Sequence, residues 1–262
     1  MKIITWNINS VRLRLDRLLL VLERHEPDVL CLQEIKCVEE QFPFEALAEA
    51  GWKAAVYGQK SYNGVALLSR HEIEDVERGL LDDVEDPQAR LISANVAGVR
   101  ILCGYFPNGG KVGSDKWTYK LEWMLRLKAL LERDYSVDEP LAVCGDFNVV
   151  PTDRDVEFAD DWADTAMCHK DGRAGLADLM SWGLSDSFRL VSDEAGVYTW
   201  WDYRRLGFPR NDGLRIDFVA VTKPLAELCT AARVDRDERK KGKVGKPSDH
   251  APYIAELDWE IA

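Results

Sequence analysis

Polar and ionisable residues directly follow several short apolar runs of this 262-residue chain. Strand-length runs that share a sheet bring such groups to one edge, which is how α/β proteins build sites. Carboxylates, amides, a phenol and an imidazole gathered there would suit a hard divalent cation together with a phosphate. The residues concerned are Asn7, Glu34, Tyr105, Asp146, Asn148, Asp217 and the triplet Ser248-Asp249-His250.

Taken one at a time, these residues have ordinary explanations. An Asp or Asn after a strand is usually a turn former or a helix cap, which covers Asn7 and Asn148. Glu34 can be a solvated strand end, and a lone histidine such as His250 is more often packed than catalytic. Asp217 is harder to dismiss, because a carboxylate between Ile and Phe is costly to bury without a partner. The hypothesis of a site therefore depends on the combination.

The elements that must position these groups are apolar runs bounded by Gly, Asn, Asp or Pro, which predict strands. We find no internal repeat, low-complexity tract or Gly/Ser linker, so we expect one α/β domain over residues 1–262. The runs are 3–6, 29–32, 65–68, 101–103, 141–144, 216–221 and 253–257.

Two segments show helical spacing of apolar residues. The first helix is expected to have Ser10 as its N-cap and Pro27 beyond its end. Its apolar face consists of Val11, Leu15, Leu18, Leu19 and Leu22. The second helix is expected to bury Trp117, Leu121, Met124, Leu125, Lys128 and Leu131.

The net charge of −12 argues at first against a nucleic-acid partner, since such proteins usually carry basic excess. The acid is concentrated, however. Residues 71–90 hold eight acids against two basic residues, and residues 151–165 hold six against one. Residues 233–246 hold seven basic residues against three acids, and residues 200–215 hold four Arg against two Asp. A local basic face can therefore coexist with an acidic chain.

The six cysteines show no CxxC and no zinc-ligand spacing. Cys31, Cys103 and Cys144 lie in apolar runs and are expected to be buried small hydrophobes, so a metal site should use oxygen ligands. No window holds the roughly 18 apolar residues of a membrane helix, and the first ten residues lack the apolar run of a signal peptide. We therefore expect a cytoplasmic protein without membrane association.

Six motifs occur in order between residues 2 and 250. They are Lys2-Ile3-Ile4-Thr5-Trp6-Asn7-Ile8-Asn9, Leu32-Gln33-Glu34, Tyr105-Phe106-Pro107-Asn108-Gly109, Gly145-Asp146-Phe147-Asn148, Gly213-Leu214-Arg215-Ile216-Asp217 and Ser248-Asp249-His250. Each is weak alone, but together they resemble the motif series of the exonuclease III family of apurinic/apyrimidinic (AP) endonucleases. The segment Trp200-Trp201-Asp202-Tyr203-Arg204 resembles the one before that family's recognition loop and favours its bacterial branch.

The resemblance implies a four-layer α/β sandwich, the fold of DNase I-like phosphodiesterases, in which helices flank two packed mixed sheets. It implies a Mg²⁺-dependent enzyme, with Mn²⁺ as a substitute, that incises duplex DNA 5′ to abasic sites and leaves a 3′-hydroxyl. It also implies 3′-phosphodiesterase and 3′-to-5′ exonuclease activity in DNA base excision repair. The partner would be double-stranded DNA with abasic sites or blocked 3′ ends, bound by a monomer.

For the metal, the resemblance implies Glu34 as a ligand, with Asp249 and Asn9 assisting directly or through water. The cation would neutralise the scissile phosphate and stabilise the leaving oxygen. Asn7 and Tyr105 would add hydrogen bonds to the developing charge. Further oxygen donors near the ion would be Asn7, Asp146 and Asn148.

For the chemical step, the resemblance makes Asp146 the candidate that orients and deprotonates the attacking water. Asn148 would position the phosphate or that water. His250 would donate to a phosphate oxygen, with Asp217 holding its ring and favouring imidazolium. The candidates for the general base, which stay open at this point, are Asp146, His250 and a Tyr105 phenolate.

Recognition of a sugar without a base needs a small apolar pocket. By motif position, Trp200 and Leu214 would line it, whereas core packing is the better interpretation of Trp201. Animal-type endonucleases carry Trp in place of Leu214, which bears on the balance of endonuclease and exonuclease activity. Lys111 either enters a DNA groove or is solvated. Phosphate contacts are expected from Arg204, Arg205, Arg210, Arg215, the run Arg239-Lys240-Lys241-Gly242-Lys243, and Lys246.

Three other functions compete with DNA repair as interpretations of the sequence. A DNase I-like nuclease, an inositol-phosphate phosphatase or a sphingomyelinase would share the Glu, Asp-x-Asn and Ser-Asp-His elements, but the motif at Tyr105 and the segment at Trp200 favour DNA repair. A binding protein on a decayed nuclease fold would have lost site residues, and every expected one is present. A cysteine-based redox enzyme would need a Cys-His constellation, which the sequence does not show.

Overall fold

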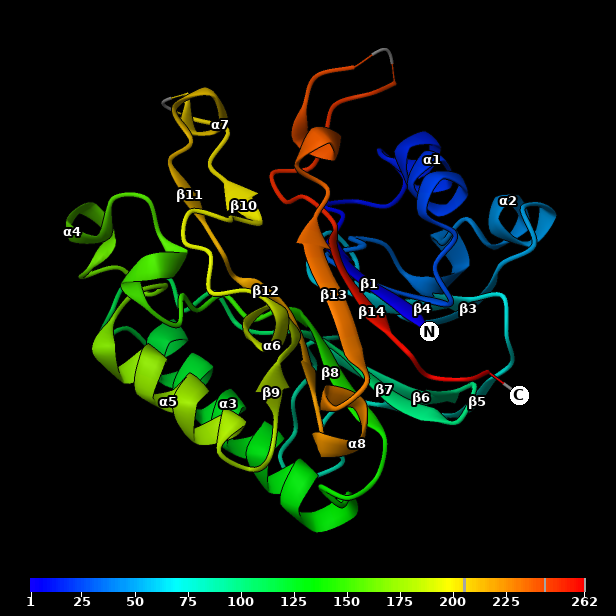
Figure 1. Ribbon diagram of the computed structural model, residues 1–262, viewed down its shortest axis with the longest axis horizontal. Helices are drawn as coiled ribbons and strands as arrows, with labels where there is room; N and C mark the ends of the chain where they lie inside the picture. Colours follow the sequence, from blue (N-terminus) through cyan, green and yellow to red (C-terminus); the bar gives the residue numbers. More distant parts are fainter. Residues whose placement is uncertain (205, 243, 262) are drawn as a thin grey trace.

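The computed structural model describes residues 1–204, 206–242 and 244–261 and contains two six-stranded sheets (Figure 1). The predicted phosphate contacts Arg205 and Lys243 lie outside the described residues. The first sheet runs in the order β13 (Cys229–Val234), β14 (Tyr253–Leu257), β1 (Lys2–Asn7), β2 (Val29–Gln33), β4 (Val65–Ser69), β3 (Lys53–Tyr57). The second runs in the order β5 (Ile73–Arg78), β6 (Leu91–Val96), β7 (Val99–Tyr105), β8 (Leu141–Asp146), β12 (Asp217–Val221), β9 (Ser185–Asp186).

Both sheets are mixed. The central pairs β1–β2 and β7–β8 are parallel, and the other pairs are antiparallel. Parallel pairing brings the last residues of β1 and β2 to one edge, where Asn7 is opposite Gln33. In the second sheet, Tyr105 and Asp217 are both opposite Asp146. A separate ribbon pairs β10 (Trp200–Trp201) with β11 (Gly213–Leu214).

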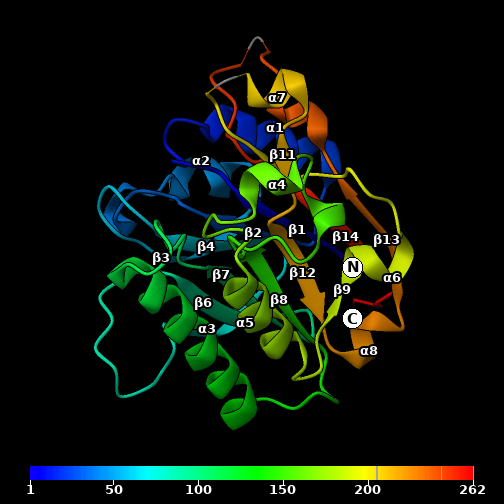
Figure 2. The same ribbon diagram turned by 90° about the vertical axis from the view of Figure 1, so that its left-hand side faces the viewer.

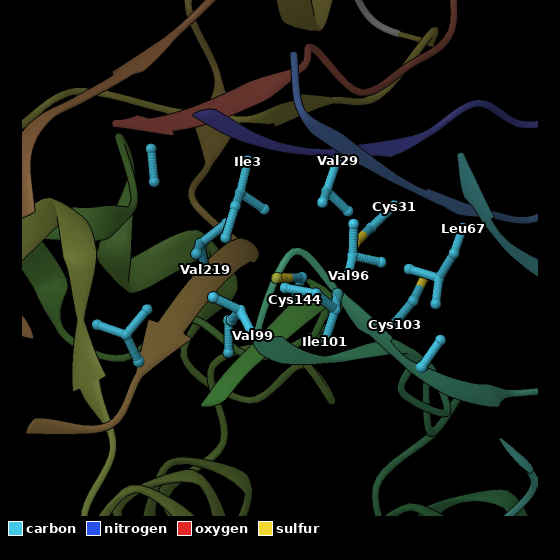
Figure 3. Packing of buried hydrophobic residues seen from close by; sticks show 14 of the residues in the cluster. Ile3, Val29, Cys31, Leu67, Val96, Val99, Ile101, Cys103, Cys144 and Val219 are labelled. Carbon is cyan, nitrogen blue, oxygen red and sulfur yellow. The ribbon is translucent and has the colours of Figure 1, made fainter. Parts of the chain in front are cut away.

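The two sheets pack face to face through alternate residues of their strands. Figure 3 shows Ile3 and Val29 of the first sheet pointing toward Ile101 and Val219 of the second. Cys31, Cys103 and Cys144 lie in the same fully buried cluster, which confirms their predicted burial. Because side chains alternate across a strand, the neighbouring residues point to the outer faces of the sheets.

Helices cover those outer faces (Figure 2). Helices α1 (Leu15–His25) and α2 (Phe44–Glu49) pack on the first sheet, and α3 (Asp115–Asp134) and α5 (Lys170–Met180) pack on the second. The four-layer sandwich predicted from the sequence is therefore confirmed. Shorter helices are η1 (Glu39–Gln41), η2 (Asp153–Asp155), α4 (Ala159–Trp162), α6 (Ser187–Val191), α7 (Gly207–Arg210), α8 (Lys223–Ala226) and η3 (Arg236–Arg239). None of the described helices is both long and apolar enough to cross a membrane.

Both helix predictions need correction at one point. Helix α1 starts at Leu15, so Ser10 is not its N-cap; Ser10 instead has φ +87° in the preceding turn. Helix α3 buries Trp117, Met124 and Leu131 as predicted, but Leu125 is 59% exposed, and Lys120, which was not predicted, has no exposed surface. A lysine is usually exposed, so Lys120 did not mark a buried face in the sequence. In the structure its ammonium donates to three backbone carbonyls inside the protein.

Candidate active site

The two sheets meet at the edge where their central strands end. The side-chain amide of Asn7 donates to Glu34 Oε1 at 2.9 Å and to Asp146 Oδ2 at 2.9 Å. Asn7 and Glu34 belong to the first sheet and its following turn, whereas Asp146 ends β8 of the second. One fully buried amide thus joins the two sheets through the predicted site.

A buried histidine lies between two buried aspartates at the same edge. His250 Nδ1 is 2.9 Å from Asp217 Oδ2, and its Nε2 is 3.7 Å from Asp146 Oδ2. Burial lowers the pKa of His250, but the carboxylates of Asp217 and Asp146 outweigh burial and raise it to about 10. At neutral pH this ring is therefore an imidazolium that can donate a proton.

Asp146 lies in a different electrostatic setting from an ordinary surface carboxyl. Burial, with Asp217 and Glu34 nearby, raises its pKa to about 7 although His250 and the Asn7 amide favour the ionised form. Its Oδ1 accepts the backbone N–H of Asn148 at 2.9 Å. The carboxyl can therefore exchange a proton near neutral pH, which suits a general base.

Asn148 follows Asp146 in the left-handed backbone region, with φ +52°. Its side-chain amide donates to the carbonyl of Phe106, and its Oδ1 accepts from Asn108 Nδ2 at 3.1 Å. These bonds fix the amide beside Asp146. The sequence did not predict the support beneath this turn: Lys120 Nζ donates to the carbonyls of Asn148 and Asn108.

Glu34 is the centre of a second polar group. Its Oε1 accepts from the Tyr105 hydroxyl at 2.8 Å as well as from Asn7, and its Oε2 lies 2.7 Å from Lys36 Nζ. Burial raises the pKa of Glu34, but the Lys36 charge and the donated hydrogen bonds outweigh burial and lower it. Tyr105 has a pKa well above its usual range, because it is buried and faces Glu34 and Asp146.

Asn9 and Asp249 extend this group toward the surface. Asn9 Oδ1 accepts from Lys36 Nζ at 2.7 Å, and Asn9 Nδ2 donates to Asp249 Oδ1 at 2.8 Å. Trp200 Nε1 donates to Asp249 Oδ2 at 3.1 Å. The predicted metal-binding residues are therefore linked in one continuous chain of contacts.

Two sets of side chains could hold a cation. Asp146, Asp217 and His250 have ligand atoms within 4.8 Å of one another and form a candidate metal site. An ion there would compete with the proton that the imidazolium carries, since a histidine ligand must be neutral. The oxygen atoms of Glu34 and Asn9 do not have this conflict, and an ammonium already lies between them. The oxygen donors of Glu34 and Asn9 fit a hard divalent cation such as Mg²⁺.

Trp200 lies beside the site, next to Asp249 and His250. The Trp200 ring is half-buried, 6.5 Å from the His250 ring and 5.7 Å from the Trp162 ring. Trp201 is fully buried, which confirms core packing. Leu214 contradicts the expectation that it lines an open pocket: it has no exposed surface and packs with Val156 and Ile216 as a support behind Trp200.

The predicted phosphate contacts divide into exposed and buried groups. Arg215 is a wrong prediction, because its guanidinium is fully buried and paired with Asp155 and Asp186 at 2.7 and 2.8 Å. Arg239 is also buried, donating to the carbonyls of Asp249 and Trp201. The exposed members are Lys111, Arg204, Arg210, Lys240, Lys241 and Lys246.

Comparisons with known proteins point to one family. The family model described as "Endonuclease/Exonuclease/phosphatase family" matches residues 4–250. Exodeoxyribonuclease III of Haemophilus influenzae is 37% identical over 98% of this chain and 100% of its own. A 3′ phosphatase, NExo from Neisseria, solved with a product DNA hairpin, is 41% identical with a TM-score of 0.94 over 99% of this chain and 100% of its own. An AP endonuclease from Archaeoglobus fulgidus is 36% identical with the same TM-score and the same coverage.

Proposed function

Because the chain belongs to the exonuclease III and AP-endonuclease branch of the endonuclease/exonuclease/phosphatase family, we propose that it incises duplex DNA 5′ to abasic sites in a divalent-cation-dependent reaction. The protein is a hydrolase and a DNA repair nuclease of that family. The finer proposal is incision that leaves a 3′-hydroxyl, by a monomer that also removes 3′ blocks and 3′ nucleotides. The observation that carries it is the Asn7 amide, which joins Glu34 to Asp146 across the two sheets opposite an imidazolium.

The protonation states of the three candidates favour Asp146 as the general base. Tyr105 has a pKa raised well above its usual range, so its phenolate is disfavoured. The pKa of about 10 makes His250 a donor at neutral pH. Asp146 has a pKa of about 7 and a carboxylate held by two donors, so it can orient a water molecule and accept its proton.

The remaining residues bind and orient the phosphate. His250 donates to a phosphate oxygen while Asp217 holds its ring, and Asn148 orients the phosphate or the attacking water. Glu34, Asn9 and Asp249 would hold Mg²⁺ or Mn²⁺, with the amides and carboxylates of Asn7, Asp146 and Asn148 nearby. When bound, the ion supplies positive charge to the scissile phosphate and the leaving oxygen.

Recognition is proposed to combine an aromatic wall with exposed cations. Trp200 is the wall, and Lys111, Arg204, Arg210, Lys240 and Lys241 contact backbone phosphates. Helix α7 and residues 240–242, which follow η3, project beyond the strand ends on the same side of the molecule (Figure 1). Since these contacts are sequence-independent, neutralising Lys240 and Lys241 together should give a shallower salt dependence of DNA binding.

The deciding experiment uses a duplex with one tetrahydrofuran abasic analogue, incubated with Mg²⁺ and separately with EDTA. Incision 5′ to the lesion only with metal supports the proposal. The same assay is run on a duplex with a 3′-phosphate, because the similarity to a 3′ phosphatase favours 3′-end processing as a second function. Release of phosphate without lesion incision would leave the 3′-end function as the better assignment. Hydrolysis of a phosphoinositide but neither DNA substrate would overturn both.

A further inference from the structure

The proposed reaction gives Lys36 no role, although Lys36 lies within the candidate site. Its ammonium is 2.7 Å from Glu34 Oε2 and 2.7 Å from Asn9 Oδ1, the oxygens of two proposed metal ligands. Glu34 Oε1 already accepts from Asn7 and Tyr105. The ammonium therefore lies between Glu34 Oε2 and Asn9 Oδ1, the two ligand oxygens that would otherwise be open to a cation.

The backbone holds Lys36 in this position. The turn has two left-handed residues, with φ +50° at Glu34 and φ +54° at Lys36. The N–H groups of Ile35 and Lys36 donate to the carbonyls of Gly64 and Asn63 at 3.1 and 3.0 Å. The turn is thus pinned to the neighbouring loop, and the side chain folds back onto Glu34, two residues earlier. The side chain is 28% exposed, so a path to solvent is open.

We infer that Lys36 is a placeholder for the divalent cation: it leaves Glu34 and Asn9 when the ion binds, and it then binds a backbone phosphate of the DNA. The inference rests on the proposed metal position. Two cations cannot share the same pair of oxygens without strong repulsion, because unit charges about 4 Å apart interact strongly near a protein surface. A displaced ammonium needs a new anionic partner, and the phosphate beside the ion is the nearest one the reaction supplies.

This exchange couples the two binding events. DNA that captures the displaced ammonium removes its competition for Glu34, so DNA should tighten metal binding, and metal should tighten DNA binding by the same factor. Without DNA, the ammonium keeps Glu34 ionised and its neighbours in place. The pairing makes the free protein a weaker metal binder than its oxygen donors alone would be.

The first test measures Mn²⁺ binding without DNA, by the loss of the free Mn²⁺ electron paramagnetic resonance signal. Four proteins are compared: wild type, Lys36→Gln, Glu34→Gln, and Lys223→Gln as a control for charge at an exposed lysine on α8. We expect Lys36→Gln to bind Mn²⁺ about tenfold more tightly, Glu34→Gln to bind it more weakly, and Lys223→Gln to match wild type. Weaker binding by Glu34→Gln with no gain in Lys36→Gln overturns the placeholder. No change in Glu34→Gln overturns the proposed metal position, and the inference with it.

The second test measures the coupling itself. Mn²⁺ affinity is determined with and without a duplex carrying the abasic analogue, in proteins that also carry Asp146→Asn to prevent cleavage. DNA should tighten Mn²⁺ binding several-fold more when Lys36 is present than when it is Gln. Equal tightening in both proteins overturns the phosphate half of the inference. Because both readouts are binding, neither requires cleavage of the duplex.

Discussion

Asp146 and Asp155 lie nine residues apart, each with 1% of its surface exposed, yet their carboxyls behave in opposite ways. The pKa of Asp146 is raised to about 7, whereas that of Asp155 is lowered below its ordinary value. Burial acts on both in the same direction. The difference therefore comes from the neighbours that each carboxyl is given.

Asp155 is surrounded by cations. Burial raises its pKa, but Arg215 at 2.7 Å and Arg189 at 2.6 Å outweigh burial, and Thr152 adds a hydrogen bond. Arg215 in turn lies over the ring of Phe218. Paired and packed in this way, Asp155 ties η2 to the start of β12 and has no proton to exchange near neutral pH.

Asp146 is given neutral donors, the carboxylates of Asp217 and Glu34 nearby, and the His250 ring as its main cation. This arrangement is costly for folding and useful for proton transfer. Burial alone therefore does not identify a candidate catalytic carboxylate. Whether its partners are arginines or amides distinguishes the two aspartates.

The largest effect is expected from Asp146→Asn. Turnover should fall about 10³-fold, since a positioned general base is worth roughly 10²–10⁴-fold. The free energy of unfolding should stay the same or rise, because an ionised carboxyl at this position is disfavoured. Single-turnover incision and urea denaturation measure the two effects. Near-wild-type turnover would remove Asp146 from the role of base.

The corresponding substitution at the second buried aspartate is Asp155→Asn. It leaves Arg189 without its carboxylate and the buried Arg215 with Asp186 alone, so the free energy of unfolding should fall by about 3–5 kcal/mol. Turnover per folded molecule should be retained at low temperature, because Asp155 lies behind the site. A large loss of turnover in a fully folded variant would show that the two clusters are not separate.

The pH dependence of stability should have opposite signs for the two residues in metal-free protein. Asp146 has a folded pKa raised to about 7, so its contribution to stability is present at low pH and is lost as the pH rises through about 7. Asp155 has a lowered pKa, so its contribution is present at neutral pH and is lost as the pH falls through its folded value.

Urea denaturation in EDTA across this range tests both signs. Relative to wild type, Asp146→Asn should gain stability from about pH 5 to about pH 8, and the deficit of Asp155→Asn should shrink toward acid pH. Curves that run parallel to wild type would contradict the assigned pKa directions.

The smallest expected effect comes from Arg189→Gln. Arg189 is the more exposed of the two arginines on Asp155, and Arg215 would stay in place. We expect a loss of about 1 kcal/mol, at the upper end of values for partly exposed ion pairs. Differential scanning calorimetry measures it, with Arg154→Gln as a more exposed control. A loss equal to that of Asp155→Asn would mean that Arg189 alone neutralises the carboxyl.

Short-range patterns predicted most of the strands, and the resemblance of the motifs implied the four layers and the candidate site residues. Apolar runs located the strands, and the groups at their ends came together as parallel pairing requires. The residues that the sequence missed depend on partners distant in the chain. Arg215 lies in a motif and was taken for a phosphate ligand, but Asp155 and Asp186 bury it. Lys36 and Lys120 were not predicted as part of the site, because only the fold supplies the acceptors that bind them.

The pairing of β1 with both β2 and β14 has a consequence for the order of assembly. Residues that must meet are 244 positions apart, as when Trp6 Nε1 donates to the carbonyl of His250. Such distant contacts close slowly. A nascent chain that has not yet passed residue 250 lacks His250 and the neighbouring strand β14. The first sheet and the site at its edge are therefore completed together, at a late stage of folding.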